Sequence, residues 1–124
     1  MTIHGRIHRV SFVHAYDGIM HNFRTQPNFR FHLLASLCAI LAGIYFNISY
    51  FEWLALIFTF NMVIVAEMLN TSIEAMVDLI TDERRQSAKV AKDVSAGMVL
   101  LSALFSISIG LFIFLPKILN TINF

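Results

Sequence analysis

Charged residues, cysteine and proline are all scarce in this chain of 124 residues. Only 14% of the residues are charged, whereas 57% are hydrophobic, and the mean hydropathy is +0.69. A composition this apolar excludes a soluble domain and indicates an integral membrane protein. The single cysteine, Cys38, excludes a disulfide within the chain. The sequence contains no internal repeat, low-complexity tract or glycine-rich phosphate loop.

Long apolar runs are what the chain does contain. A spanning helix needs roughly 20 apolar residues to cross a hydrocarbon core of ~30 Å, so a chain of this length holds about three. We predict an all-α integral membrane protein, one membrane-embedded domain over 1–124, with transmembrane helices at about 30–48, 51–80 and 88–116. Pro116 is expected to end the third helix. Three helices enclose little space, so we expect an oligomer.

The segment at about 7–25 has a different pattern. Apolar side chains recur there at helical spacing, at Phe12, Tyr16, Ile19 and Phe23. Charged and histidine side chains take the other directions, which is typical of an amphipathic helix on a membrane surface. Pro27 interrupts this helix, because proline lacks a backbone donor and disfavours helix at the preceding residue.

Basic residues mark the predicted orientation. They lie before the first apolar run, as Arg6, Arg9, Arg24 and Arg30, and between the second and third, as Arg84, Arg85, Lys89 and Lys92. By the positive-inside rule, the N-terminus and the loop at 80–93 face the cytoplasm. The short turn at 47–51 then faces outside.

The second apolar run holds polar groups that a membrane rarely accommodates. On a helix turning about 100° per residue they fall within roughly 80° of one another, as a single stripe of Glu67, Asn70, Glu74 and Asp78. Ionisable side chains in a spanning segment indicate function. The stripe and the basic start of the third helix flank the same loop, so we expect them to be neighbours.

Two functions suit this stripe. Of Glu67 and Glu74, one carboxylate can abstract a proton while the other binds a hard cation. Lys92 can bind phosphate through its positive charge. Phosphoryl transfer requires groups of these kinds. The stripe equally suits a proton- or cation-coupled small membrane transport subunit. A non-catalytic packing subunit is a third interpretation. Few polar groups continue from Glu67 toward the outer face, which favours phosphoryl transfer over transport.

The run EMLNTSIEAMVD at 67–78, followed by Ala91-Lys92-Asp93 and Ala96-Gly97, closely resembles the signature of the prokaryotic diacylglycerol kinase family. The resemblance covers about residue 12 to residue 116. Its outer features are more similar to the Gram-positive branch, which includes undecaprenol kinases. These features are Gly18, Asn28-Phe29-Arg30 with His32, and Glu52-Trp53.

The resemblance implies a homotrimer that transfers the γ-phosphate of ATP to a membrane lipid alcohol, undecaprenol or diacylglycerol, using Mg²⁺. It implies sites at subunit contacts near the cytoplasmic face of the bacterial inner membrane, and we expect no nucleic-acid partner. Glu67 matches the family's general base, Asn70 a helper at the reacting centre, and Glu74 a metal ligand. The positions that match the ATP and phosphate region are Asp78, Lys92, Asp93, Gly18 and Arg30.

One position departs from the family pattern. At Gln26 the family usually has a glutamate that holds metal together with the Glu74 position. A glutamine carbonyl can still coordinate Mg²⁺, but one negative charge is missing. We therefore expect a working site that needs more magnesium, unless a neighbour such as Asp17 compensates.

Other polar features are given no catalytic part. Glu52 and Trp53 are predicted to be interfacial anchors. The spacings of His14, His21 and His32 do not put them on one face, so surface or headgroup contact is favoured over a metal cluster. Small residues follow one face of the third helix, a pattern that lets membrane helices pack closely, at Ser95, Ser102, Ser106 and Gly110.

Overall fold

Four α-helices make up the described part of the chain. The structure is a computed structural model that describes residues 7–123, with side chains from residue 11, so Arg6 and the side chain of Arg9 lie outside it. The helices are α1 (Ile7–Thr25), α2 (Pro27–Tyr45), α3 (Tyr50–Ile80) and α4 (Gln86–Ile122), and there is no strand among these residues. The predicted all-α fold is confirmed.

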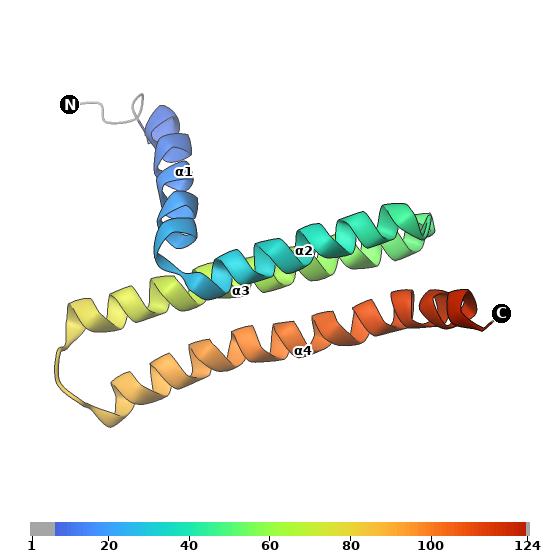
Figure 1. The fold of residues 1–124 in the computed structure, drawn as a ribbon. Helices are drawn as coiled ribbons and strands as arrows, with labels where there is room; N and C mark the ends of the chain where they lie inside the picture. The colour runs from blue at the N-terminus through green and yellow to red at the C-terminus, as the bar shows by residue number, and fades with distance from the viewer. Residues whose placement is uncertain (1–6, 124) are drawn as a thin grey trace.

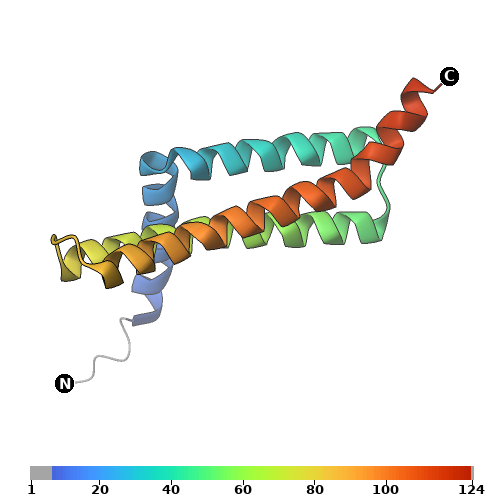
Figure 2. The ribbon, with the colours of Figure 1, turned by 90° about the horizontal axis from the view of Figure 1, so that it is seen from below.

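Three long helices run side by side, and α1 projects away from them at the start of α2 (Figures 1 and 2). α3 packs most extensively against α4 and less extensively against α2. Each of α2, α3 and α4 is long and apolar enough to cross a membrane. The three predicted spans are therefore present, and α3 begins one residue from its predicted start.

Gln26 and Pro27 make the corner between α1 and α2. Gln26 is extended, with φ −111° and ψ 102°, and Pro27 takes the first helical position, where its missing N–H is no loss. The Arg30 guanidinium donates to the backbone carbonyls of Phe23 and Arg24, at 3.1 Å each, and so ties the two helices together. α2 accordingly begins three residues before its predicted start.

Ser49 and Glu52 begin α3. The Ser49 hydroxyl accepts from the Glu52 amide at 3.3 Å, and a Glu52 carboxylate oxygen accepts from the Ser49 amide at 2.8 Å, which together form a capping box. The preceding turn takes Asn47 into the left-handed region, at φ 50°, and ends α2 at Tyr45 rather than the predicted 48. Glu52 therefore starts a helix in addition to any interfacial role.

The prediction that Pro116 ends the third spanning helix is wrong, because α4 continues through it to Ile122. A proline inside a helix removes one backbone hydrogen bond and bends the helix, but it does not have to end it. The last part of α4 turns away from the line of the rest (Figure 2). This extension carries Lys117, whose ammonium donates to the other Glu52 carboxylate oxygen at 2.8 Å.

Gly43 allows α2 to approach the start of α3. It is buried, and a Cβ built on it would lie 2.7 Å from the Trp53 ring and 3.0 Å from the Ile48 side chain. Ile48 belongs to the small buried core, together with Leu56 of α3 and Ile113 of α4. The glycine is therefore required by close packing rather than by its backbone conformation.

We predict that Gly43→Ala destabilises the fold relative to Gly110→Ala. Both variants gain the same helix propensity, but a Cβ at Gly110 meets nothing within 4 Å, whereas one at Gly43 overlaps Trp53. Overpacking of this kind costs about 1–3 kcal/mol. Unfolding of both variants by sodium dodecyl sulfate in mixed micelles measures the difference, and equal stabilities would contradict this account of the α2–α3 contact.

Candidate active site

The polar stripe lies on one side of α3 and becomes more exposed along the helix. Glu67 is 2% exposed, Asn70 and Glu74 are half-buried, and Asp78 is exposed. The stripe therefore passes from a buried carboxylate to an exposed one within about three helical turns. All four residues were predicted as site residues, and the α3–α4 loop lies just beyond them.

Glu67 faces α2. Its Oε1 atom lies 3.4 Å from Nε2 of His32, and this oxygen is sealed from solvent without a hydrogen-bond partner among the described residues. Sequence reasoning grouped His32 with the surface histidines and missed this contact. The available signal was its position, since His32 lies on the apolar helix just after the matched Arg30. His14 and His21 are exposed on α1.

Asn70 connects α3 to α4. Its side-chain amide donates to Glu74 Oε1 at 3.4 Å, and its carbonyl oxygen accepts from the Ser95 hydroxyl at 2.7 Å. Ser95 is 1% exposed, and its hydroxyl also contacts the Lys92 carbonyl oxygen at 2.9 Å. Ser95 was expected only to pack helices together. Its hydroxyl instead orients the amide of a predicted site residue.

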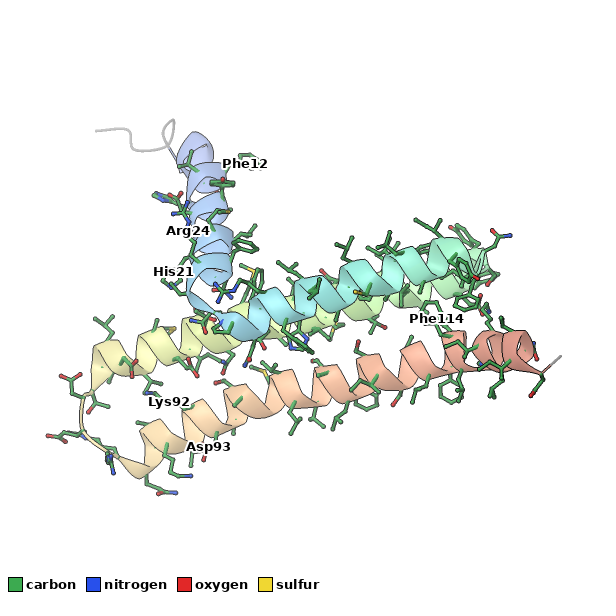
Figure 3. All side chains as sticks on the ribbon, viewed as in Figure 1. Phe12, His21, Arg24, Lys92, Asp93 and Phe114 are labelled. Atoms are coloured by element: carbon green, nitrogen blue, oxygen red, sulfur yellow. The ribbon has the colours of Figure 1, made fainter. Side chains whose placement is uncertain are left out.

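Lys92 and Asp78 meet between α4 and α3, as the shared loop predicted. The lysine ammonium lies 2.6 Å from the Asp78 carboxylate, and Figure 3 places Lys92 and Asp93 on the first turns of α4. Asp93 pairs instead with Lys89 on its own helix, at 2.5 Å. All four side chains are substantially exposed, so these pairs contribute little stability and are easily exchanged for a phosphate.

A cavity of about 570 Å³ opens between the end of α3 and the start of α4. Charged side chains of both signs line it, namely Asp78, Asp82, Glu83, Arg84, Arg85, Lys89, Lys92 and Asp93. Arg85 pairs with Glu83 at 2.9 Å. The cavity has the cationic groups that a polyphosphate needs, at the exposed end of the stripe.

The remaining predicted site residues lie on α1 and at the start of α2. Gln26 donates to the Thr25 hydroxyl at 3.3 Å, and Arg30 binds the carbonyls that end α1. A Cβ built on Gly18 meets nothing within 4 Å. Asp17 lines a separate cavity of about 340 Å³ on α1. No interaction among the described residues joins Gln26 to Glu74.

The donors for Mg²⁺ form an incomplete set within one chain. The part of the chain that the structure describes contains no group of three or more histidine, cysteine, aspartate or glutamate side chains that could hold a metal. Mg²⁺ is commonly bound by one or two carboxylates together with substrate phosphates. The half-buried Glu74, whose Oε1 accepts a long hydrogen bond from the Asn70 amide, fits that kind of shared site.

Comparison with known proteins identifies the family. Residues 13–114 match the family model described as prokaryotic diacylglycerol kinase. The chain is 44% identical over 108 residues to the undecaprenol kinase of Bacillus subtilis (strain 168), which covers 87% of this chain and 88% of that protein. It is 36% identical over 112 residues to a diacylglycerol kinase of Synechocystis, which covers 90% of this chain and 64% of that relative.

A more distant relative is the diacylglycerol kinase of Escherichia coli (strain K12), which is 26% identical over 94 residues, or 76% of this chain and 77% of that protein. The family match includes every predicted site residue, from Gly18 to Asp93. It also agrees with the three membrane-length helices. The chain therefore belongs to the prokaryotic diacylglycerol kinase family and is a lipid kinase.

Proposed function

We propose that this protein transfers the γ-phosphate of ATP to the hydroxyl group of a membrane lipid at the cytoplasmic face of a bacterial inner membrane. The observation that carries the proposal is the stripe on α3, in which a buried carboxylate leads to an exposed ion pair with Lys92. We place undecaprenol first as the acceptor, because the relative that is 44% identical is an undecaprenol kinase, and diacylglycerol second.

Glu67 is the general base in this proposal. As the lipid oxygen attacks the γ-phosphorus, the hydroxyl proton passes to the Glu67 carboxylate, and ADP leaves. The burial of Glu67 supports this role, because a carboxylate among apolar side chains is in position to meet a hydroxyl that enters sideways from the bilayer. The Asn70 amide, held by Ser95, helps at the reacting centre.

Lys92 and Glu74 act on the nucleotide side. Lys92 leaves its exposed pair with Asp78 to neutralise phosphate charge, and Glu74 with Gln26 would hold Mg²⁺. A metal ion there would neutralise the negative charge on the phosphates during transfer. Asp78, Asp93, Gly18 and Arg30 complete the ATP region.

A homotrimer is part of the proposal. Gln26 has no interaction with Glu74 within the described chain, so a subunit contact is the way to complete the metal site. Large apolar side chains remain exposed along α2, α3 and α4, and these faces can contact lipid or another subunit. We also propose that α1 lies on the membrane surface, since Phe12, Tyr16 and Ile19 are exposed on it.

The transport interpretation has less support. Thr59 and Asn61 lie between the start of α3 and Glu67. The buried Thr59 hydroxyl donates to the Ala55 carbonyl oxygen at 2.7 Å, and Asn61 is exposed. Beside this part of α3 lies a cavity of about 590 Å³ with a mostly apolar lining, which includes Phe58, Met62, Leu101 and Phe105. Such a lining suits the hydrocarbon of a lipid better than the path of an ion.

We predict that Glu67→Gln lowers the turnover number by several powers of ten while the protein stays folded and trimeric. The amide keeps the size of the side chain but cannot accept the proton. Transfer of labelled phosphate from ATP in mixed micelles measures the loss. Glu52→Gln is the control, because it removes a carboxylate from the other end of α3; near-normal turnover in Glu67→Gln would remove Glu67 as the base.

The same assay, with undecaprenol and diacylglycerol offered in parallel, decides the acceptor. A labelled polyprenyl phosphate identifies the first lipid and labelled phosphatidic acid the second. If the intact trimer phosphorylates neither lipid in abundant Mg²⁺, the proposed acceptors are wrong, and cation transport by the same stripe becomes the function to measure.

We predict that Gln26→Glu lowers the Mg²⁺ concentration needed for half-maximal activity, because it restores a carboxylate beside the metal that Glu74 holds. Activity is titrated with Mg²⁺ at saturating ATP. Asn28→Glu adds the same charge two residues along and should not lower the requirement. If Gln26→Glu and the unaltered protein have the same Mg²⁺ dependence, Gln26 is not a metal ligand.

A further inference from the structure

The carboxylate of Glu67 has a feature that the proposed roles do not use. The Glu67 side chain is only 3% exposed, and its Oε1 atom is sealed from solvent. This oxygen has no hydrogen-bond partner among the described residues. Burying a charged oxygen without a donor is costly, so such atoms in proteins are normally hydrogen-bonded. The other oxygen, Oε2, is not among the side-chain atoms that are both sealed and without a partner.

His32 is the group that faces the sealed oxygen. Its Nε2 lies 3.4 Å from Oε1 but makes no hydrogen bond to it, so a small change in the His32 or Glu67 rotamer would align the N–H with the oxygen. The imidazole is 17% exposed and packs edge-on against the Phe31 ring, with 5.7 Å between the ring centroids. It also borders a cavity of about 370 Å³ between α2, α3 and α4. It is well placed but not yet hydrogen-bonded to the carboxylate.

The surroundings of His32 argue against simple packing. From Phe31 to Ile44, α2 is apolar apart from His32, Ser36 and the thiol of Cys38. The Ser36 hydroxyl donates to the His32 backbone carbonyl oxygen, at 2.8 Å, and not to the imidazole ring. An imidazole on this apolar helix, opposite a buried carboxylate oxygen, is suited to donate a hydrogen bond.

We propose that His32 is a positioning residue for phosphoryl transfer. The imidazole donates a hydrogen bond from its Nε2–H to Oε1 of Glu67 and holds the carboxylate with Oε2 turned toward the lipid hydroxyl. Hydrogen bonds at catalytic groups are often long before substrate binds and shorten in the complex. The inference rests on the proposed role of Glu67 as the base.

The first experiment separates the hydrogen bond from the volume of the side chain. His32→Leu removes the donor, and His32→Gln replaces it with an amide N–H close to the position of Nε2. We expect His32→Leu to lower the turnover number about 10- to 100-fold, from the usual strength of a hydrogen bond to a charged group, with the KM for ATP nearly unchanged. His32→Gln should recover most of the loss.

Cys38→Ala is the matched control, because it alters another side chain of α2 that borders the same cavity. It should leave turnover unchanged. If His32→Leu is as active as Cys38→Ala, or if His32→Gln is as slow as His32→Leu, the positioning role is wrong. If Glu67→Gln retains turnover, the proposed base itself is wrong, which is a separate failure.

The second experiment needs no activity. The ¹⁵N resonances of the His32 ring, assigned by their loss in His32→Gln, should shift in Glu67→Gln and stay unchanged in Asp82→Asn, which removes a carboxylate in the α3–α4 loop. An unchanged His32 signal in Glu67→Gln would overturn the contact. This measurement also decides the matter if His32→Leu does not fold.

Discussion

A buried carboxylate is the constraint on which the rest of this structure depends. Glu67 is 2% exposed, and the part of α3 that precedes it is mostly apolar. A charge in that position is costly unless other groups compensate for it. The helices on both sides place polar groups beside it, with His32 of α2 opposite Glu67 and Ser95 of α4 bonded to Asn70 one turn along. The site is therefore built from three helices although its stripe lies on one.

The pairing of α3 with α4 is held near both ends. Lys117 pairs with Glu52 at the start of α3, and Lys92 pairs with Asp78 near its end. These exposed or half-exposed pairs add little stability individually, but both form in the observed register of the two helices. That register brings the fully buried Ser95 opposite Asn70. The bend in the last part of α4 belongs to the same arrangement, because this part carries Lys117.

Local rules predicted the helices well. The amphipathic period, the proline corner and the long apolar runs predicted α1 at 7–25 and α3 to within one residue of Tyr50–Ile80. Errors arose where a local signal has two outcomes. Proline can end a helix or bend it, and α4 continues through Pro116 to Ile122. At Pro27 the same residue began a helix, because it stands at the first position.

The sequence by itself determined the membrane class, the three spans, the stripe of Glu67, Asn70, Glu74 and Asp78, and the family, because these depend on composition, helical period and a long signature. Only the tertiary structure decided the partners of Glu67 and Asn70 on the neighbouring helices. The Glu67–His32 and Asn70–Ser95 contacts join residues that are 35 and 25 positions apart. No helical period relates residues on different helices, so the register of the packed helices alone brings these side chains together.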